Sequence, residues 1–259
     1  MDQPVLVTGG RGSLGRPTVE RLLSDGVAVR VMSRRERPPG DDRPYGWARA
    51  DLRSGRGLPE ALHGVGAVVH CATDGRTDVR QTRRLVEEAR KSGARPHLVY
   101  ISIVGVDRIP FFYYRQKLAA ERLVESSGLP WTILRATQFH GLVAGMTLAQ
   151  RRLPVVFTLR GLRIQPVAVT EVADRLAALA QEPAAGRVPE MGGPRVRDAV
   201  ELARATLRAA GRHRRVVPLR LPGRTAAAFR AGYQLCPERA VGTGTFEEFL
   251  AERVVSGRL

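Results

Sequence analysis

The chain opens with Met1-Asp-Gln-Pro-Val-Leu-Val-Thr-Gly-Gly-Arg-Gly-Ser-Leu-Gly15, the stretch that decides its fold. Residues 5–7 are a short apolar run that is typical of a buried strand, and Thr8 closes it. A glycine-rich turn follows, and after it the sequence predicts a helix over residues 13–25. The N-terminus of such a helix directs its N–H groups and its positive dipole end toward a bound phosphate.

Three glycines in this turn are spaced three residues apart: Gly9, Gly12 and Gly15. Between a strand and a helix, one glycine permits a tight reversal, one lets the backbone approach a pyrophosphate, and one lets the helix pack close to the strand. A second apolar run, residues 28–32, completes a βαβ unit of the expected length. The sequence therefore predicts a dinucleotide site here, and a structural turn without a ligand is the alternative.

Length and composition fit one large α/β domain, or such a domain with a smaller appendage. The chain has 259 residues, of which 43% are hydrophobic, enough for a well-buried core. No apolar run approaches the length that crosses a bilayer, and the N-terminus is predicted as a core strand and not as a signal peptide. We therefore expect a cytoplasmic protein with no membrane partner. The two cysteines, Cys71 and Cys236, and the five histidines are scattered, which gives no support to a metal site.

The net charge is +17 and the basic residues are almost all arginine, since Lys91 and Lys117 are the only lysines. So basic a chain suggests nucleic acid as a partner, because phosphate backbones attract such surfaces. However, the arginines are spread through every segment, and no zinc finger, helix-turn-helix or aromatic RNA-binding motif accompanies them. We interpret the arginine as a compositional habit, expect no nucleic-acid partner, and expect anionic small molecules to be attracted.

Strand and helix signals alternate along the first half of the chain, the pattern of a doubly wound parallel sheet. Strands are predicted at residues 5–8, 28–32, 45–52, 67–71, 97–102 and 131–134, and helices at residues 13–25, 76–93 and 113–126. Because connections between parallel strands are right-handed, the carboxyl ends of these strands meet at one edge of the sheet, where a dinucleotide lies.

The alternation loosens from residue 141. A hairpin or a loop with strands is predicted over residues 153–165, a helix opened by a threonine cap over 170–181, and a short strand over 187–191. Further helices are predicted over residues 196–210, 225–235 and 245–255. We therefore predict a dinucleotide-binding core over residues 1–140 and a smaller C-terminal α/β substrate lobe over residues 141–259, interleaved in a single compact unit.

The end of the second strand bears on the choice of cofactor. Folds that take NAD place an acidic residue there, which accepts the ribose 2′-hydroxyl, whereas this chain has Ser33, Arg34 and Arg35. A hydroxyl and guanidinium groups suit a 2′-phosphate, and Arg11 in the turn could reach it from the other side. NADP(H) is therefore favoured over NAD(H), with a merely solvated Arg35 as the alternative. The residues expected to bind the cofactor are Thr8, Gly9, Gly10, Arg11, Gly12, Ser13, Leu14, Gly15, Ser33, Arg34, Arg35, Asp51, Leu52, Cys71, Ala72, Thr73, Ser102 and Lys117.

Ser102, Tyr113 and Lys117 are the candidate catalytic residues. Ser102 ends the fifth predicted strand, and the other two are four apart on the following helix, so they share one face. An ammonium beside a phenol lowers the phenol pKa and makes it a better proton donor to a ketone oxygen, which the serine hydroxyl also binds. In a chain that otherwise uses arginine, a lysine here indicates a need for a compact ammonium. Tyr114 is the competing phenol, because a spacing of three also shares a helix face.

Five residues are candidates for contact with the substrate: Phe111, Phe112, Gln138, Phe139 and His140. The two at positions 111 and 112 lie next to the start of that helix and would form an aromatic wall for a flat molecule. The other three follow the sixth predicted strand. Core packing for the first pair, and packing between lobes for the other three, are the alternatives.

The combination of Thr8-Gly-x-x-Gly-x-x-Gly15, Ser102 and Tyr113-x-x-x-Lys117 resembles the short-chain dehydrogenase/reductase superfamily, and more narrowly its atypical NmrA-like and isoflavone-reductase-like branch. The likeness covers about residues 3–140 and, more loosely, residues 165–173. It implies a Rossmann fold, NADP(H), and hydride transfer to a ketone or quinone of a small aromatic substrate, with the serine, tyrosine and lysine as the catalytic set. A role in tailoring a secondary metabolite, such as an antibiotic, is a further expectation that rests on analogy.

The chain departs from the family pattern between the serine and the tyrosine. Tyr113 follows Ser102 by only eleven positions, and Asp107-Arg-Ile-Pro110 replaces the small polar loop of ordinary members. Atypical members sometimes lose or bypass the tyrosine, so that a hydroxyl of the substrate stabilises the alkoxide, and some act as nucleotide sensors. A redox sensor that binds the dinucleotide without turning it over therefore stays an alternative to the reductase.

Overall fold

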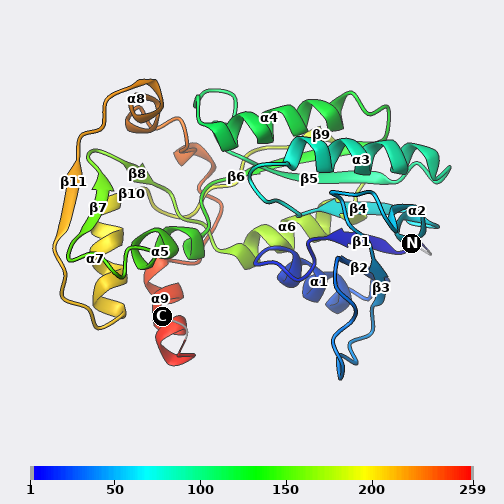
Figure 1. Ribbon diagram of the computed structural model, residues 1–259, viewed down its shortest axis with the longest axis horizontal. Helices are drawn as coiled ribbons and strands as arrows, with labels where there is room; N and C mark the ends of the chain where they lie inside the picture. The colour runs from blue at the N-terminus through cyan, green and yellow to red at the C-terminus, as the bar shows by residue number, and fades with distance from the viewer. Residues whose placement is uncertain (1–2, 258–259) are drawn as a thin grey trace. The chain divides into compact units, whose positions relative to one another are not determined.

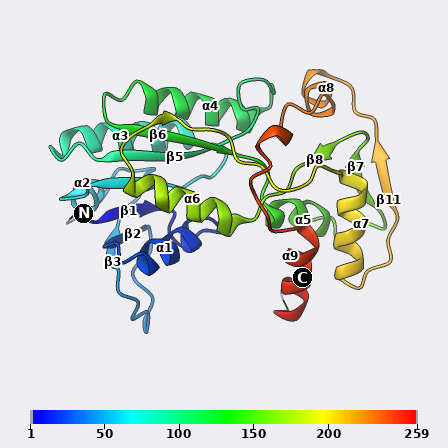
Figure 2. The ribbon, with the colours of Figure 1, turned by 180° about the vertical axis from the view of Figure 1, so that it is seen from behind.

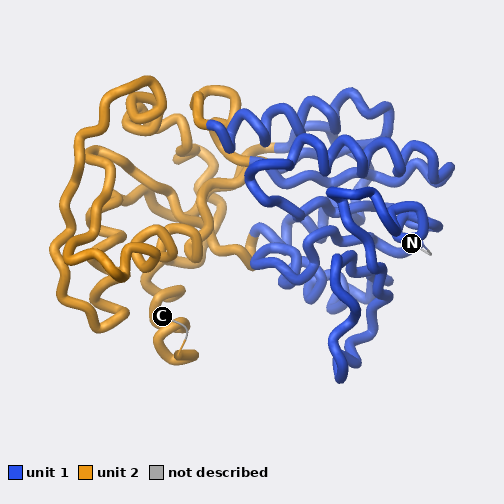
Figure 3. The backbone as a smooth tube through the Cα atoms, viewed as in Figure 1, with its two compact units in different colours: residues 1–102, 112–134, 172–188 blue, residues 103–111, 135–171, 189–259 orange. Residues whose placement is uncertain are grey.

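A computed structural model describes residues 3–257 (Figure 1). Residues 1–2 and 258–259, which the predicted domain bounds include, lie outside the described residues. The chain forms two compact units, each assembled from separate segments (Figure 3). Unit 1 takes the chain up to residue 102 together with residues 112–134 and 172–188, and unit 2 takes residues 103–111, 135–171 and the chain from residue 189. The division predicted between residues 140 and 141 stays a prediction.

Unit 1 is built on a seven-stranded sheet in the order β3-β2-β1-β4-β5-β6-β9. Its strands are β1 (Val5–Thr8), β2 (Val29–Ser33), β3 (Gly46–Arg49), β4 (Ala67–His70), β5 (His97–Ile103), β6 (Trp131–Ala136) and β9 (Gly186–Arg187). β1 pairs in parallel with β2 and β4, and the pairs of β2 with β3, β4 with β5, and β6 with β9 are parallel too. The predicted doubly wound α/β sheet of the Rossmann type is confirmed.

Helices cover both faces of this sheet (Figure 1, Figure 2). On one face lie α2 (Leu58–Leu62), α3 (Asp78–Lys91) and α4 (Phe112–Glu125). On the other lie α1 (Gly15–Ser24) and α6 (Val169–Gln181), which are joined by a hydrogen bond from Gln181 to Asp25 at 3.2 Å. Helices follow β1, β3, β4 and β5 and cross back over the sheet, whereas β2 is joined to β3 by a loop without a helix. The carboxyl ends of these parallel strands share one edge.

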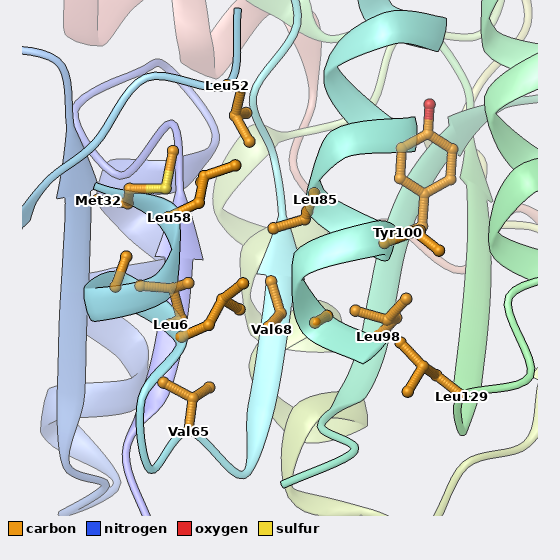
Figure 4. Close-up of a cluster of buried hydrophobic side chains, with 14 of the residues drawn as sticks. Leu6, Met32, Leu52, Leu58, Val65, Val68, Leu85, Leu98, Tyr100 and Leu129 are labelled. Carbon is orange, nitrogen blue, oxygen red and sulfur yellow. The ribbon is translucent and has the colours of Figure 1, made fainter. Parts of the chain in front are cut away.

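A continuous apolar cluster fills the face under α2, α3 and α4 (Figure 4). Leu6, Val68 and Leu98 stand side by side on β1, β4 and β5, and they belong to one cluster with Leu85 of α3 and Ala120 of α4. All five are at most 2% exposed. Burying one such leucine contributes about 1.5–3 kcal/mol, so this row fixes the register of the three strands on which the candidate site depends.

Unit 2 contains two small sheets and several helices. β7 (Val156–Leu159) pairs in parallel with β11 (Val216–Leu219), and β8 (Arg163–Ile164) pairs antiparallel with β10 (Arg197–Asp198). Its helical elements are α5 (His140–Leu148), α7 (Ala199–Ala209), α8 (Arg224–Arg230), the 3₁₀ turn η1 (Pro237–Arg239) and α9 (Phe246–Val255). Val156 is fully buried against α7, which supports the β7–β11 pair from one side.

Four differences from the predicted elements have structural causes. Over residues 153–165 the hairpin is wrong and the loop with strands is right, because β7 and β8 pair with β11 and β10 and not with each other. The helix predicted over residues 225–235 ends at Arg230, and Gly232 follows with φ +83°, which a helix does not allow. Thr170 lies inside the first turn of α6, since the helix begins at Val169. The helices α2 and α5 were not predicted, because α2 is only five residues long and α5 contains two glycines.

Candidate active site

The glycine turn between β1 and α1 is packed too tightly for side chains. Gly9 has φ +65°, a left-handed conformation that favours glycine, and a Cβ at this position would lie 3.0 Å from the backbone of Ala72. A Cβ on Gly15 would lie only 2.2 Å from the carbonyl oxygen of Gly9. The start of α1 therefore rests directly on the turn, which is the close approach that the glycine spacing predicts.

The first turn of α1 is open to an anion. Its N-cap residue, Leu14, supplies no side-chain hydrogen bond, and the turn contains no acidic residue. A helix start of this kind presents backbone N–H groups and the positive end of the helix dipole. Arg11 is exposed and adds a positive charge in the turn. Gly12 and Arg16 donate their N–H groups to the carbonyl oxygens of Gly9 and Gly12, and Pro17 has none, so at the start of α1 the N–H groups of residues 13–15 are the ones available to a pyrophosphate.

The turn after β2 holds its backbone in place and leaves guanidinium groups exposed. Ser33 Oγ accepts the backbone N–H of Arg35 at 3.1 Å, and the carbonyl oxygen of Arg35 accepts the indole N–H of Trp47 at 3.1 Å. Arg34 is exposed and makes no hydrogen bond or ion pair within residues 3–257. Arg35 is also exposed, and only its backbone is engaged, so within residues 3–257 two guanidinium groups without a side-chain partner follow the carboxyl end of β2, close to a fixed serine.

The loops after β3 and β4 are joined by an ion pair. Arg53 donates to Asp74 Oδ2 through Nε at 3.1 Å and Nη2 at 2.7 Å. Asp51 is occupied within its own turn, where it accepts the backbone N–H of Arg53 at 2.8 Å and the Ser54 hydroxyl at 3.3 Å, and Leu52 is buried. The carboxylate of Asp51 therefore shapes the loop, whatever else it contacts. Burial raises the pKa of Cys71, which follows β4, to about 12, so it is a thiol at neutral pH.

A row of polar side chains lies above the apolar cluster, at the carboxyl end of the same strands. Thr8, His70 and Tyr100 face one another across β1, β4 and β5, and each is at most 3% exposed. Sequence reasoning missed His70, because it assigned residues 67–71 to a buried strand and the histidines to no site. The signal was available, since a histidine that closes an otherwise apolar strand must find hydrogen-bond partners there.

Lys117 is buried and points at the sheet. Its ammonium donates to the carbonyl oxygen of Ile101 at 2.7 Å and lies 4.2 Å from the centroid of the Tyr100 ring. Burial lowers the pKa of Lys117 to about 8. Ser102 is 3% exposed, and its hydroxyl has no hydrogen-bond partner within residues 3–257. An unpartnered buried hydroxyl at the end of β5 is a group that a ligand can satisfy.

Tyr113 reaches the loop after β4. Its hydroxyl lies 3.3 Å from Oγ1 of Thr73, which donates to the buried carboxylate of Asp78 at 2.6 Å. Because the threonine proton is used on the carboxylate, the phenol is the donor in the first of these bonds. Burial raises the pKa of Tyr113. The expectation that Lys117 lowers this pKa is therefore wrong, since its ammonium is turned to the carbonyl of Ile101 instead.

The competing phenol, Tyr114, is 6% exposed and packs edge-on against the ring of Tyr113. The hydroxyl of Tyr113, by contrast, contacts residue 73, next to Ala72, and Ala72 in turn lies against Gly9. A short path, Gly9 to Ala72 to Thr73 to Tyr113, thus connects the glycine turn with the phenol within unit 1. This arrangement favours Tyr113 over Tyr114 as a group near a bound dinucleotide.

The candidate substrate residues fall mostly in unit 2. Phe111 is 45% exposed and packs edge-on against Phe229, and Phe112, in unit 1, is 55% exposed. Phe139 caps the start of α5 and bridges to Val167. His140 is buried against the rings of Phe246 and Phe249, and burial lowers its pKa.

Gln138 differs from its neighbours. Both atoms of its carboxamide, Oε1 and Nε2, are buried without a hydrogen-bond partner in the described chain, and so is Nε2 of His140. Each buried polar group without a hydrogen bond costs about 1–3 kcal/mol of stability. A ligand with matching polar groups would recover this free energy by making the missing hydrogen bonds.

A family model described as NAD(P)H-binding matches residues 9–183, which is more than half of the chain. The chain belongs to the NAD(P)H-binding family. The matched range begins at the glycine turn, just after β1, and ends just after α6, and the family is described as NAD(P)H-binding. The resemblance predicted from the glycines, Ser102 and the tyrosine–lysine pair is confirmed at this level.

Curated relatives include a reductase. The (4-alkanoyl-5-oxo-2,5-dihydrofuran-3-yl)methyl phosphate reductase of Streptomyces griseus is 30% identical over 215 residues, which cover 80% of this chain and 74% of that protein. A photosystem II assembly factor of Trieres chinensis is 27% identical over 169 residues, which cover 60% of this chain and only 52% of that protein. Family members thus carry different roles, and the chain spans about half the length of the second relative.

Solved structures share the fold. An NADPH-dependent quinone oxidoreductase from Escherichia coli, complexed with NADPH, has a TM-score of 0.80 at 18% identity, covering 96% of this chain and 99% of that one. The Citrobacter sp. triphenylmethane reductase, complexed with NADP(H), has a TM-score of 0.70 at 19% identity, covering 99% and 100%. Relatives and structural neighbours thus include NAD(P)H-dependent reductases.

Membrane-spanning helices and metal-ligand clusters are both absent from the residues that the structure describes. Among residues 3–257, no helix combines the length and the apolar character needed to cross a membrane. Within the same range, His, Cys, Asp and Glu side chains form no group of three or more that could hold a metal ion.

Proposed function

We propose that this protein is an NADPH-dependent reductase that transfers hydride to a ketone or quinone carbon of a small aromatic molecule. The observation that carries the proposal is the contact path from Gly9 through Ala72 and Thr73 to the Tyr113 hydroxyl. This path connects a proton donor with residues 9–15, which we propose as the backbone cradle for the pyrophosphate. Membership of the NAD(P)H-binding family and the reductases among relatives support it. A place in the biosynthesis of a secondary metabolite stays a prediction.

NADPH is proposed over NADH because of the turn after β2. Arg34 is exposed and unengaged in the described chain, Ser33 is fixed beside it, and no carboxylate stands at the end of this strand to accept a ribose hydroxyl. A guanidinium binds phosphate oxygens in a bidentate way, and Arg11 adds a second positive charge from the glycine turn.

Three side chains of unit 1 are proposed to perform the chemistry beside the cofactor, which supplies the hydride when bound. The phenol of Tyr113 gives its proton to the carbonyl oxygen as the negative charge develops there, and the free hydroxyl of Ser102 donates a hydrogen bond to the same oxygen. Lys117 holds the end of β5 through the Ile101 carbonyl and supplies positive charge to the site. We also propose that residues 111, 112 and 138–140 contact the substrate, supported by the unpartnered carboxamide of Gln138.

The test is consumption of NADPH by the purified protein with a panel of quinones and aromatic ketones, followed by the loss of nicotinamide absorbance. Tyr113→Phe is expected to lower kcat about a hundredfold or more while changing the Kd for NADPH less than about twofold, because the phenol acts only on the substrate. Tyr114→Phe is the matched control and should retain activity. Unchanged turnover in Tyr113→Phe would remove this phenol from the reaction.

A dinucleotide sensor without turnover is the second candidate. It is favoured by two observations: burial raises the pKa of Tyr113, and Lys117 is turned to a backbone carbonyl. Both candidates predict NADPH binding, and they differ in consumption. Tight binding with no turnover across the panel would support the sensor, and turnover with any of these compounds would exclude it.

A further inference from the structure

A histidine lies at the centre of a buried hydrogen-bond chain beneath the glycine turn. His70, the last residue of β4, is 3% exposed. Its Nδ1 lies 2.7 Å from Oγ1 of Thr8, the last residue of β1, and its Nε2 lies 3.1 Å from Oγ1 of Thr82 on α3. Thr8 Oγ1 also accepts the backbone N–H of Ala72 at 3.2 Å. One imidazole thus joins two adjacent strands and the helix that covers them.

The hydrogen bonds favour one assignment of the ring proton of His70. Burial, followed by the positive charge of Lys117, lowers the pKa of His70 to about 3, so the ring is neutral. Since Thr8 Oγ1 accepts from Ala72, its own proton is free to be donated to Nδ1. The proton of the ring then resides on Nε2 and is donated to Thr82. We assign this tautomer because it uses the Thr8 hydroxyl both as the acceptor from Ala72 and as the donor to Nδ1, whereas in the other tautomer Thr8 Oγ1 would accept twice.

The chain of bonds ends in the two loops that form the proposed cofactor edge. Gly9 follows Thr8 directly, and Ala72 lies two residues beyond His70. The two loops are also in close contact, since a Cβ on Gly9 would lie 3.0 Å from Ala72. A displacement of the Thr8 hydroxyl would therefore shift the glycine turn relative to the loop that carries Ala72 and Thr73.

We propose that His70 is a positioning residue for the dinucleotide, which sets the spacing of the loops after β1 and β4. Packing alone does not explain a histidine here, because residues 67–69 of the same strand are apolar and fully or almost fully buried. A buried imidazole stabilises the fold only through the bonds it makes, whereas an apolar side chain would fill the space without this requirement. The inference rests on the cofactor binding within the proposed function and on no particular substrate.

The test compares the Kd for NADPH, measured calorimetrically on the full chain, among variants of this network. His70→Leu and Thr8→Val are each expected to raise the Kd about tenfold, and the double variant little further, since both break the same bond. Thr82→Val removes the partner of Nε2 without touching either loop, and it should change the Kd less than about threefold. His70→Asn, whose amide can still meet Thr8, should recover part of the loss.

Three outcomes would overturn the proposal. The first is a His70→Leu protein that melts at a lower temperature yet binds NADPH within about twofold of the wild type, and the second is additive effects of His70→Leu and Thr8→Val. The third is nitrogen NMR of isotope-labelled histidine that shows His70 charged, or protonated on Nδ1, at neutral pH. A wild-type protein that binds NADPH but reduces nothing would refute the reductase alone, and the affinities would still decide the role of His70.

Discussion

The glycine turn of unit 1 and residues 138–140 of unit 2, which we propose bind the cofactor and the substrate, present their polar groups by opposite means. The turn uses the backbone, since a Cβ on Gly15 would lie 2.2 Å from Gly9 and the first turn of α1 has no capping side chain. Residues 138–140 use side chains, since the amide of Gln138 and Nε2 of His140 are buried without partners in the described chain. A backbone cradle accepts any suitably placed phosphate, whereas a set of side chains is specific to its ligand. The type of cofactor can therefore be predicted from the sequence, whereas the substrate depends on side chains that are particular to this protein.

The largest expected effect is the loss of NADPH binding when a methyl group is added to the backbone cradle. Gly15→Ala is expected to weaken NADPH binding more than about a hundredfold and to destabilise the fold by about 1–3 kcal/mol. The reason is that the added Cβ would collide with the backbone of Gly9 and Gly10. Gly145→Ala is the control, because in the middle of α5 a Cβ at this position would meet no neighbouring residue within 4 Å, and it should stabilise the protein by up to about 1 kcal/mol. Calorimetric titration and urea unfolding measure both effects. Normal NADPH affinity in Gly15→Ala would contradict the cradle.

A smaller effect on affinity is expected at Arg34, which tests the preference for NADPH, with its 2′-phosphate, over NADH. Arg34→Ala is expected to raise the Kd for NADPH about tenfold and the Kd for NADH less than about twofold, because the lost guanidinium binds only the 2′-phosphate. Arg16→Ala on α1 is the matched control, since that guanidinium pairs with Glu20 at 2.9 Å. Equal losses for the two dinucleotides would show that Arg34 contributes general charge and no selectivity.

The pH dependence of stability compares the buried histidines of the two units. An unfolded histidine binds a proton below about pH 6.5, whereas folded His70, with a pKa of about 3, does not. The free energy of unfolding should therefore fall as the pH falls through this window, by up to about 1.4 kcal/mol per pH unit, and His70→Asn should reduce the slope. His140→Asn should reduce the slope less, because a hydrogen bond with the backbone of Pro166, and then Glu171 and other nearby carboxylates, oppose the effect of burial on the pKa of His140. Urea unfolding at several pH values gives the slopes, and a larger effect at His140 would reverse this ranking.

The smallest expected change in stability is at Gln138. Gln138→Met removes two unpartnered polar atoms at similar volume, so the free energy of unfolding should stay the same or rise by about 1 kcal/mol. The KM for the substrate should rise while the Kd for NADPH stays within about twofold. A loss of stability would mean that the carboxamide has a structural role, and an unchanged KM would take Gln138 out of the substrate site.

The sheet and the glycine turn could be predicted from the sequence because the residues that determine them are close together in the chain. Residues 5–15 contain the strand, the positive φ of Gly9 and the close packing at Gly15 within a few positions. The direction of Lys117 could not be predicted from its spacing to Tyr113, because the carbonyl that it contacts belongs to β5, sixteen residues earlier. The partners of His70 come from β1 and α3, and strands β7 and β11 find each other across about sixty residues of chain. Contacts of that range leave no periodic signal in the sequence.

The interleaving of the two units has a consequence for synthesis on the ribosome. β9, only two residues long, completes the sheet beside β6, yet it is made after β7 and β8 of the other unit. β7 in turn waits for β11, so the nascent protein carries unpaired strand edges until most of it has emerged, a state in which chains are prone to aggregate. A truncated clone that stops before residue 186 lacks the closing strand of unit 1, so expression trials should include residues 186–188 even when only nucleotide binding is wanted.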